Sequence, residues 1–221
     1  MDNRKIYAVL TGDLIGSSRF KIEEQRDEVL SILKDSLNKI ESTDVIELPF
    51  TIHRGDSFQG VLSSPEEALK AAITIRASLL STFKGKKGRL DTRIAIGIGR
   101  IEYLSRTQVG EGDGEAFRNS GMELDTMKKG ERNLVIKTPW HDINEELKTE
   151  CVLLDALIKR WTKEQSEAIL YHIEGATQDE IAKKLNIKQS AVSQRLKTGS
   201  FRAVHEFLER YKAIIQYNVG G

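Results

Sequence analysis

The chain has 221 residues, 34 Lys and Arg against 33 Asp and Glu, a net charge of +1, and 39% hydrophobic residues. This composition is ordinary for a soluble globular protein, and no apolar run approaches the ~18 residues that a membrane-spanning helix needs. The one cysteine, Cys151, excludes an internal disulfide framework, and with four histidines it leaves no ligand set for zinc. We therefore expect a cytoplasmic protein without a membrane partner.

The first part of the chain alternates between strand and helix patterns. Gly55 and Asp56 separate two short apolar segments, which is a hairpin signal. Ser64 and Pro65 open a helix, with Ser64 expected as its cap. In chain order we expect a strand at 5–11, a loop at 12–18, a helix at 22–40, strands at 50–54 and 57–62, a helix from 64 to 80, a basic turn at 85–88, a strand at 93–103, a loop at 106–115, a helix at 116–127 and a strand at 133–137.

This order of strands and helices predicts an α+β fold with a ferredoxin-like, palm-type sheet. From Asp142 onward the pattern is helical only. We therefore expect two domains, a palm-like domain over residues 1–140 and an all-α domain over residues 141–221. Trp140 and Trp161 are expected to pack at their junction, and the glycines at 97 and 99 to allow close backbone packing inside a strand.

The all-α part contains a pattern typical of a helix-turn-helix. Capping boxes at residues 162–165 and 177–180 start two helices, and the second is followed by a turn at Asn186. Two helices that cross steeply need a small residue at their contact, which Ala182 supplies, and Asn186 tolerates a left-handed conformation. Apolar residues that would close the corner are Ile181, Leu185, Ile187, Val192 and Leu196.

The next helix, which begins near Gln189, presents groups that can reach bases and phosphates in the major groove of duplex DNA. From Thr177 to the end, eight basic residues face four acids, and residues 188–202 contain no acid. The alternative is a generic helical hairpin with a polar surface. The DNA-contacting residues that we predict are Gln178, Lys188, Gln189, Ser190, Ser193, Gln194, Arg195 and Lys197.

Residues 158–210 resemble the helix-turn-helix of region 4 of bacterial sigma factors and of similar regulators. The resemblance implies DNA binding but specifies no operator sequence. Because one such helix covers only a few base pairs, we expect a homodimer on a two-fold site.

Two acidic motifs stand out in the first part of the chain. Asp13 lies at the end of the first predicted strand, and Asp56 lies in the predicted hairpin turn. Two carboxylates on neighbouring strands suit Mg²⁺ or Mn²⁺. A following loop with free backbone N–H groups suits a nucleoside triphosphate, and its residues are Leu14, Ile15, Gly16, Ser17 and Ser18. The alternative is that Gly-Asp is a common turn and that a strand-end aspartate only caps the next segment.

Four motifs occur in sequence along the chain: Asp13, Asp56, the segment RIAIGIG at 93–99 and the segment GEAFRNSGMEL at 114–124. Their order over residues 5–137 resembles that of class III nucleotidyl cyclases. The whole chain resembles the SatD family of bacterial proteins. The resemblance implies that Asp13 and Asp56 bind metal and that Asn119 matches the asparagine that cyclases place near the transition state. Two positions depart from it, because Glu123 stands where cyclases have an arginine and Ile52 where they have a base-selecting lysine.

Three hypotheses follow. The leading one is a DNA-binding transcriptional regulator whose degenerate cyclase-like domain senses a nucleotide or dimerises. The alternative is an active metal-dependent nucleotidyl cyclase or transferase that its helix-turn-helix localises, against which Glu123 and Ile52 argue. The third is a protein-interaction scaffold, which would not need the basic stretch at 188–202.

Overall fold

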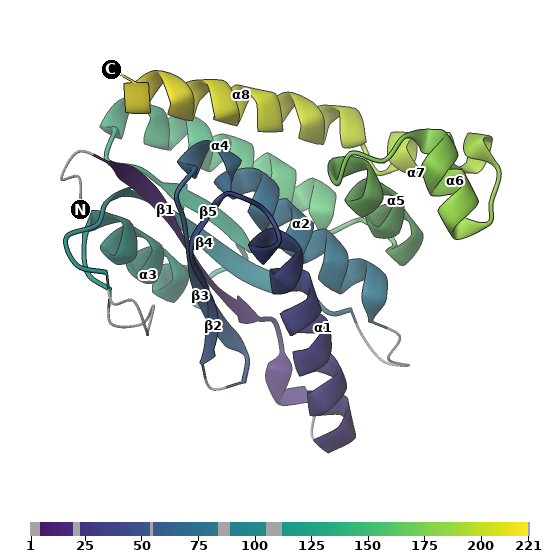
Figure 1. The fold of residues 1–221 in the computed structure, drawn as a ribbon, viewed down its shortest axis with the longest axis horizontal. Coiled ribbons are helices and arrows are strands. Elements are labelled where there is room, and N and C mark those ends of the chain that lie inside the picture. The colour runs from purple at the N-terminus through teal and green to yellow at the C-terminus, as the bar shows by residue number, and fades with distance from the viewer. Residues whose placement is uncertain (1–4, 20–22, 54, 84–88, 105–111, 221) are drawn as a thin grey trace.

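A computed structural model describes residues 5–19, 23–53, 55–83, 89–104 and 112–220. They contain one five-stranded sheet in the order β2-β3-β1-β4-β5, with β4 and β5 parallel and the other neighbours antiparallel. Figure 1 shows the sheet with helices on both of its faces. The strands are β1 (Ile6–Leu14), β2 (Ile46–His53), β3 (Ser57–Leu62), β4 (Thr92–Arg100) and β5 (Leu134–Lys137).

The helices alternate with these strands in the predicted order and then follow one another to the C-terminus. Those of the first part are η1 (Ser17–Arg19), α1 (Glu23–Glu41), η2 (Pro65–Glu67), α2 (Ala68–Thr82) and α3 (Glu115–Met127). Those of the second part are α4 (His141–Ile158), α5 (Lys163–Ile173), α6 (Gln178–Leu185), α7 (Gln189–Thr198) and α8 (Phe201–Gly220). The predicted mixed α+β sheet followed by a helical part is confirmed at this level.

The two faces of β4 pack against different helices. Ile94, Ile96 and Ile98 alternate along the strand and join the main hydrophobic core with α1 and α2. The opposite face carries Ala95 and Gly97, against which α3 packs. An alanine Cβ at Gly97 would lie 2.2 Å from the carbonyl oxygen of Ala116, so the predicted close backbone packing is confirmed there.

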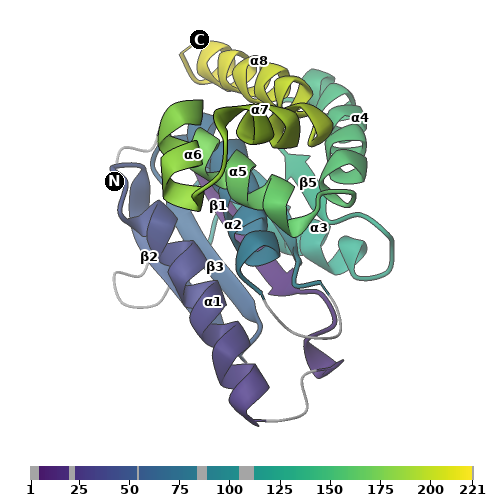
Figure 2. The same cartoon turned by 90° about the vertical axis from the view of Figure 1, so that its right-hand side faces the viewer.

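The helical part packs on the first part through one continuous hydrophobic core, which includes strand residues such as Leu10 and helix residues such as Leu154 and Ile215. α5 packs on α2, and α4 packs on β5 and α8. Figure 2 shows α5 lying over α2, with α8 along one side of the molecule. The hydroxyl of Tyr211 donates to the Pro65 carbonyl oxygen at 2.7 Å. The domain boundary near residue 140 stays a prediction.

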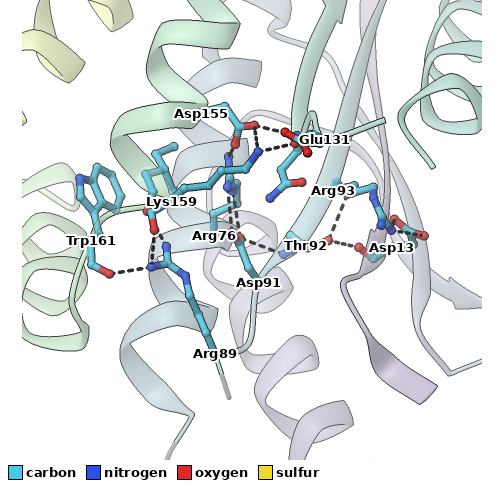
Figure 3. Close-up of polar contacts among 12 residues, drawn as sticks. Asp13, Arg76, Arg89, Asp91, Thr92, Arg93, Glu131, Asp155, Lys159 and Trp161 are labelled. Carbon is cyan, nitrogen blue, oxygen red and sulfur yellow. Dashed lines mark hydrogen bonds and ion pairs between the residues drawn. The ribbon is translucent and has the colours of Figure 1, made fainter. Parts of the chain in front are cut away.

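A buried ion-pair network also joins the two parts (Figure 3). Arg76, on α2, donates two hydrogen bonds to Asp91 at 2.9 and 2.8 Å and one to Asp155 of α4 at 2.9 Å. Lys159 lies 3.0 Å from the second oxygen of Asp155. Both partners of Arg76 are buried, so one positive and two negative charges are removed from water together, and Lys159 supplies the second positive charge that balances them.

Hydrogen bonds from another arginine fix the C-terminal end of α4. Arg89 donates to the carbonyl oxygens of Ile158, Lys159 and Trp161 (Figure 3). The indole N–H of buried Trp161 donates to the Gly199 carbonyl oxygen at 2.8 Å, between α7 and α8. Trp161 therefore lies at a junction of helices, and its expected place between two domains stays a prediction.

Several local predictions differ from the structure. β1 continues to Leu14, so Gly12 and Asp13 lie within the strand rather than in a loop, because both pair with β3 and β4. The side chain of Ser64 makes no capping hydrogen bond, so the expected serine cap is wrong. Strand β4 ends at Arg100, and Tyr103 forms only an isolated bridge with Asp113. The predicted turn at 85–88 and most of the loop at 106–115 lie outside the described residues.

Candidate functional site

The two predicted aspartates come from neighbouring strands. Asp13 pairs in register with Ser57 of β3 on one side and with Arg93 of β4 on the other. Asp56 lies in the hairpin turn after Gly55, whose φ of 79° needs a residue that tolerates the left-handed region. The N–H of Leu14 donates to the Asp56 carbonyl oxygen at 2.9 Å, which fixes the turn beside the end of β1.

Asp13 already has a cationic partner. The Arg93 guanidinium nitrogen Nη1 lies 3.4 and 3.3 Å from the two carboxylate oxygens (Figure 3). Burial raises the pKa of Asp13 above its usual value, while Arg93 and, further along, Lys128 lower it, and the negative charge of Asp56 adds to the increase. Neither Arg93 nor Lys128 is predicted as a site residue by the sequence. Arg93 stood in the RIAIGIG segment, but only the pairing of β4 with β1 places it opposite Asp13.

The carboxylate of Asp56 is partnered by hydroxyl groups. Ser17 donates to one oxygen at 2.8 Å, and the hydroxyl of Ser57 lies 3.4 Å from the other. Carboxylate and hydroxyl oxygens are ligands that Mg²⁺ and Mn²⁺ accept. With Arg93 on Asp13, however, the residues as arranged do not fit a cation shared by the two aspartates. In the part of the chain that the structure describes, no group of three or more His, Cys, Asp or Glu side chains is placed to hold a metal ion.

The predicted nucleotide loop is partly engaged in the fold. Leu14 is the last residue of β1, and its side chain is buried in the main core. Its N–H is bound to Asp56, and the N–H of Ile15 donates to the Asp91 carbonyl oxygen at 2.9 Å. The expectation of free N–H groups is therefore wrong for these two residues. Gly16 adopts a φ of 68°, and Arg19 folds back to donate to its carbonyl oxygen at 3.2 Å. The side chain of Ser18 lies outside what the structure describes.

Within one chain, Asn119 does not lie beside Asp13 and Asp56. Its side-chain amide, buried on α3, donates to the Ile98 carbonyl oxygen at 2.9 Å. Ile98 pairs with Ala8, five residues before Asp13 on β1, which corresponds to roughly 17 Å along the strand. Glu123 lies one turn further along α3 and is partly buried. Ile52 lies on β2 opposite Phe58.

The second group of predicted residues lies on α6, α7 and the turn between them. Both capping boxes are present, with Thr162 and Gln165 at α5 and with Thr177 and Glu180 at α6. Asn186 ends α6 in the left-handed conformation, with φ 52° and ψ 48°, so these local predictions are confirmed. Ala182 is buried, and its carbonyl oxygen accepts from the N–H of Ile187 at 3.0 Å, which closes the turn.

Most of the predicted contact residues on α7 face solvent. Those with exposed side chains are Lys188, Gln189, Ser190, Ser193, Gln194 and Lys197. Gln189 donates to the side chain of Gln178 at 2.7 Å, which links the starts of α7 and α6. Arg195 differs from the expectation of full exposure, because it is partly buried and forms an ion pair of 3.6 Å with Glu167 of α5. No helix among the described residues is long and apolar enough to cross a membrane.

Comparisons with known proteins give one family and a set of similar solved structures. The family model described as the SatD family matches residues 7–213. No curated protein matches the chain. Among solved structures, the chain is similar to the active GGEEF domain of a diguanylate cyclase from Vibrio cholerae, at 19% identity and a TM-score of 0.45, over 62% of this chain and 85% of that chain. It is also similar to a bacterial light-regulated adenylyl cyclase, at 14% identity and a TM-score of 0.47, over 59% of this chain and 74% of that chain.

Proposed function

We propose that this chain, which belongs to the SatD family, is a DNA-binding transcriptional regulator. In this proposal α6 and α7 form a helix-turn-helix, and α7 enters the major groove. The sheet domain, which resembles a nucleotidyl cyclase palm, senses a nucleotide beside Asp13 and Asp56 or pairs two copies of the chain.

The observation that carries the proposal is the solvent-facing surface of α7. Lys188 and Lys197 are exposed at its two ends, with exposed amide and hydroxyl side chains between them. No acidic residue occurs from 188 to 202 to repel phosphates. Lysines contact the DNA backbone and release counterions, whereas Gln and Ser side chains can hydrogen-bond base edges.

The packing of α7 supports the same interpretation. Its buried side, Val192 and Leu196, packs in the main core with Ile181 of α6. The capped start of α6 and the left-handed turn at Asn186 fix the direction of the chain between the two helices. Figure 1 shows α6 and α7 at one end of the molecule, away from the sheet.

Arg195 has a smaller part in this proposal than its sequence position suggested. Glu167 already pairs with its guanidinium, and a contact with DNA would have to compete with that ion pair. We therefore assign phosphate contacts mainly to Lys188 and Lys197, and base contacts mainly to Gln189, Ser193 and Gln194.

The test is duplex binding by the full chain, measured by fluorescence anisotropy at two salt concentrations. We expect binding that weakens with salt, and Lys197→Ala should reduce the salt slope by about one because one fewer counterion is released. The double variant Lys188→Glu and Lys197→Glu should bind at least about tenfold more weakly at low salt.

The matched control is Lys148→Glu, which changes the charge of an exposed lysine on α4 and should leave binding unchanged. Because one recognition helix covers few base pairs, selected operators should contain two half-sites about 34 Å apart. Equal binding by the double variant and the wild type, or wild-type binding without salt dependence, would contradict the proposal.

A further inference from the structure

The outer face of α4 carries exposed apolar side chains. Leu153 is 63% exposed and Val152 is 48% exposed, and both lie within the helix rather than at its ends. Thr149 and Ala156 are exposed one turn before and one turn after them. Residues three and four positions apart are neighbours on a helix surface, so these four side chains form one surface, here called the α4 patch. Figure 2 shows α4 along the right-hand edge of the molecule.

The fold of one chain uses the opposite face of α4. Leu147, Cys151, Leu154 and Ile158 are buried there, and the helix packs on β5 and α8. A helix that packs on one side normally carries polar residues on the other. Exposed apolar residues that are gathered on one helix face mark a surface for another protein. The α4 patch is therefore a candidate interaction surface.

The two ends of the α4 patch carry opposite charges. Glu145 is exposed one turn before Thr149, and Arg160 is exposed four residues after Ala156, just past the end of α4. Glu145 lies 3.2 Å from Lys148 of its own helix, but such an exposed pair contributes little and leaves Glu145 open to a further partner.

A second copy of the chain is complementary to this surface when the two α4 helices run antiparallel. Val152 of each copy then lies opposite Leu153 of the other, and Thr149 lies opposite Ala156. The same register places Glu145 opposite Arg160, because all three pairings are symmetric about the point between Val152 and Leu153. A parallel arrangement would instead bring like charges together at both ends.

We propose that two copies of this chain associate through the α4 patch, with a two-fold axis between Val152 and Leu153. In such an interface each contact is made twice, so apolar residues meet apolar residues and each acid meets a base at both ends. Because one helix from each copy supplies the contact, the dimer is weak and its population rises with protein concentration. The inference extends the proposed function, in which two copies bind a two-fold site, and it is tested without DNA.

The first experiment measures the oligomeric state of the full chain by sedimentation equilibrium over a range of concentrations. We expect a monomer–dimer equilibrium for the wild type. Leu153→Glu places a carboxylate at the centre of the interface in both copies and should weaken the dimer at least about tenfold. The matched control is Met122→Glu on α3, since Met122 is also 63% exposed but lies outside the α4 patch, and it should leave the dimer unchanged.

A charge exchange tests the antiparallel arrangement independently of the apolar residues. Glu145→Arg and Arg160→Glu each place like charges opposite one another twice in the dimer, so each should weaken it about three- to tenfold. The double variant Glu145→Arg with Arg160→Glu restores the opposite charges, and its dissociation constant should return to within about threefold of the wild-type value. A second substitution would not rescue a helix that the first had merely damaged.

Four outcomes would overturn the inference. The wild type might remain monomeric at its highest soluble concentration, Leu153→Glu might dimerise as tightly as the wild type, Met122→Glu might weaken the dimer as much as Leu153→Glu does, or the double variant might associate no more tightly than the single variants. Because these measurements contain no DNA, a dimer that binds no duplex contradicts only the proposed DNA binding, and a monomer that binds duplex contradicts only this inference.

Discussion

The folded protein raises the pKa of the Asp13 carboxyl group above its usual value. This side chain is mostly buried, and burial raises its pKa more than Arg93 and Lys128 lower it. A carboxyl group with a raised pKa in the folded state binds its proton more tightly than the unfolded chain does. Its contribution to stability is therefore present at low pH and is lost as pH rises through the raised pKa.

Replacement of Asp13 by asparagine tests the direction of this pH dependence of stability. Asp13→Asn cannot ionise, so its free energy of unfolding relative to wild type should increase between about pH 4 and pH 7. Urea unfolding at the two pH values measures the difference. The control is Asp44→Asn, at an exposed aspartate in the turn before β2. A difference that is the same at both pH values, or that decreases as pH rises, would contradict the assignment.

A second residue, Glu123, bears on whether the protein has cyclase activity. The resemblance seen in the sequence implies that Glu123 stands where class III cyclases carry an arginine, and an acid there would repel the charge that develops on phosphates. Loss of a charge stabiliser worth ~3–4 kcal/mol slows a reaction several hundredfold. We expect no cyclic nucleotide from ATP or GTP with Mn²⁺ at micromolar protein, followed by chromatography. Robust cyclic product would favour the enzyme over the sensor.

At the scale of elements, α3 lies against β4 because Gly97 leaves room for it. An alanine Cβ at Gly97 would meet the Ala116 carbonyl oxygen at 2.2 Å and the Ser120 backbone nitrogen at 2.4 Å. Neither backbone atom can move without displacing the helix. Gly121 lies on α3 itself, and an alanine Cβ there would have no atom of the described residues within 4 Å beyond its own stretch of helix.

These two glycines form a matched pair. Gly97→Ala should lower the free energy of unfolding by about 1–3 kcal/mol through overpacking. Gly121→Ala should raise it by up to about 1 kcal/mol, because alanine favours the helix. Urea unfolding of both variants measures the contrast. Equal effects of the two substitutions would show that α3 does not press on β4 at Gly97.

At the scale of the whole molecule, the sheet and the C-terminal helices share one core and one buried ionic network. Arg76 is fully buried and holds Asp91, which precedes β4, together with Asp155 of α4. Asp155 also accepts from the N–H of Asn133 at 2.9 Å, next to β5. The network therefore ties three parts of the chain that lie far apart in sequence.

Removal of the central cation should be costly. Arg76→Met leaves buried Asp91 without its cation and Asp155 with Lys159 alone, and we expect a loss of about 3–5 kcal/mol in the free energy of unfolding. Arg210→Gln, which removes an exposed ion pair with Glu146, should cost less than about 1 kcal/mol. Chemical denaturation compares the two. If both variants lose similar amounts of stability, the network does not join the two parts as described.

The sequence by itself determined the features that depend on neighbouring residues. The order of strands and helices, the two capping boxes and the left-handed Asn186 all follow from patterns within a few positions, and the structure confirms them. Membership in the SatD family was also predicted from the sequence and is confirmed. Such features are encoded locally because helix periodicity, caps and turns involve residues at most a few positions apart.

Only the tertiary structure decided which distant residues meet. Arg93 lies 80 residues from Asp13, and Arg76 lies 79 residues from Asp155, so strand register and helix packing alone bring them together. The same holds for Asn119, which donates to Ile98 instead of approaching the aspartates, and for Arg195, which pairs with Glu167. Shifting a strand by one residue would turn its side chains to the opposite face, so no local pattern specifies these partners.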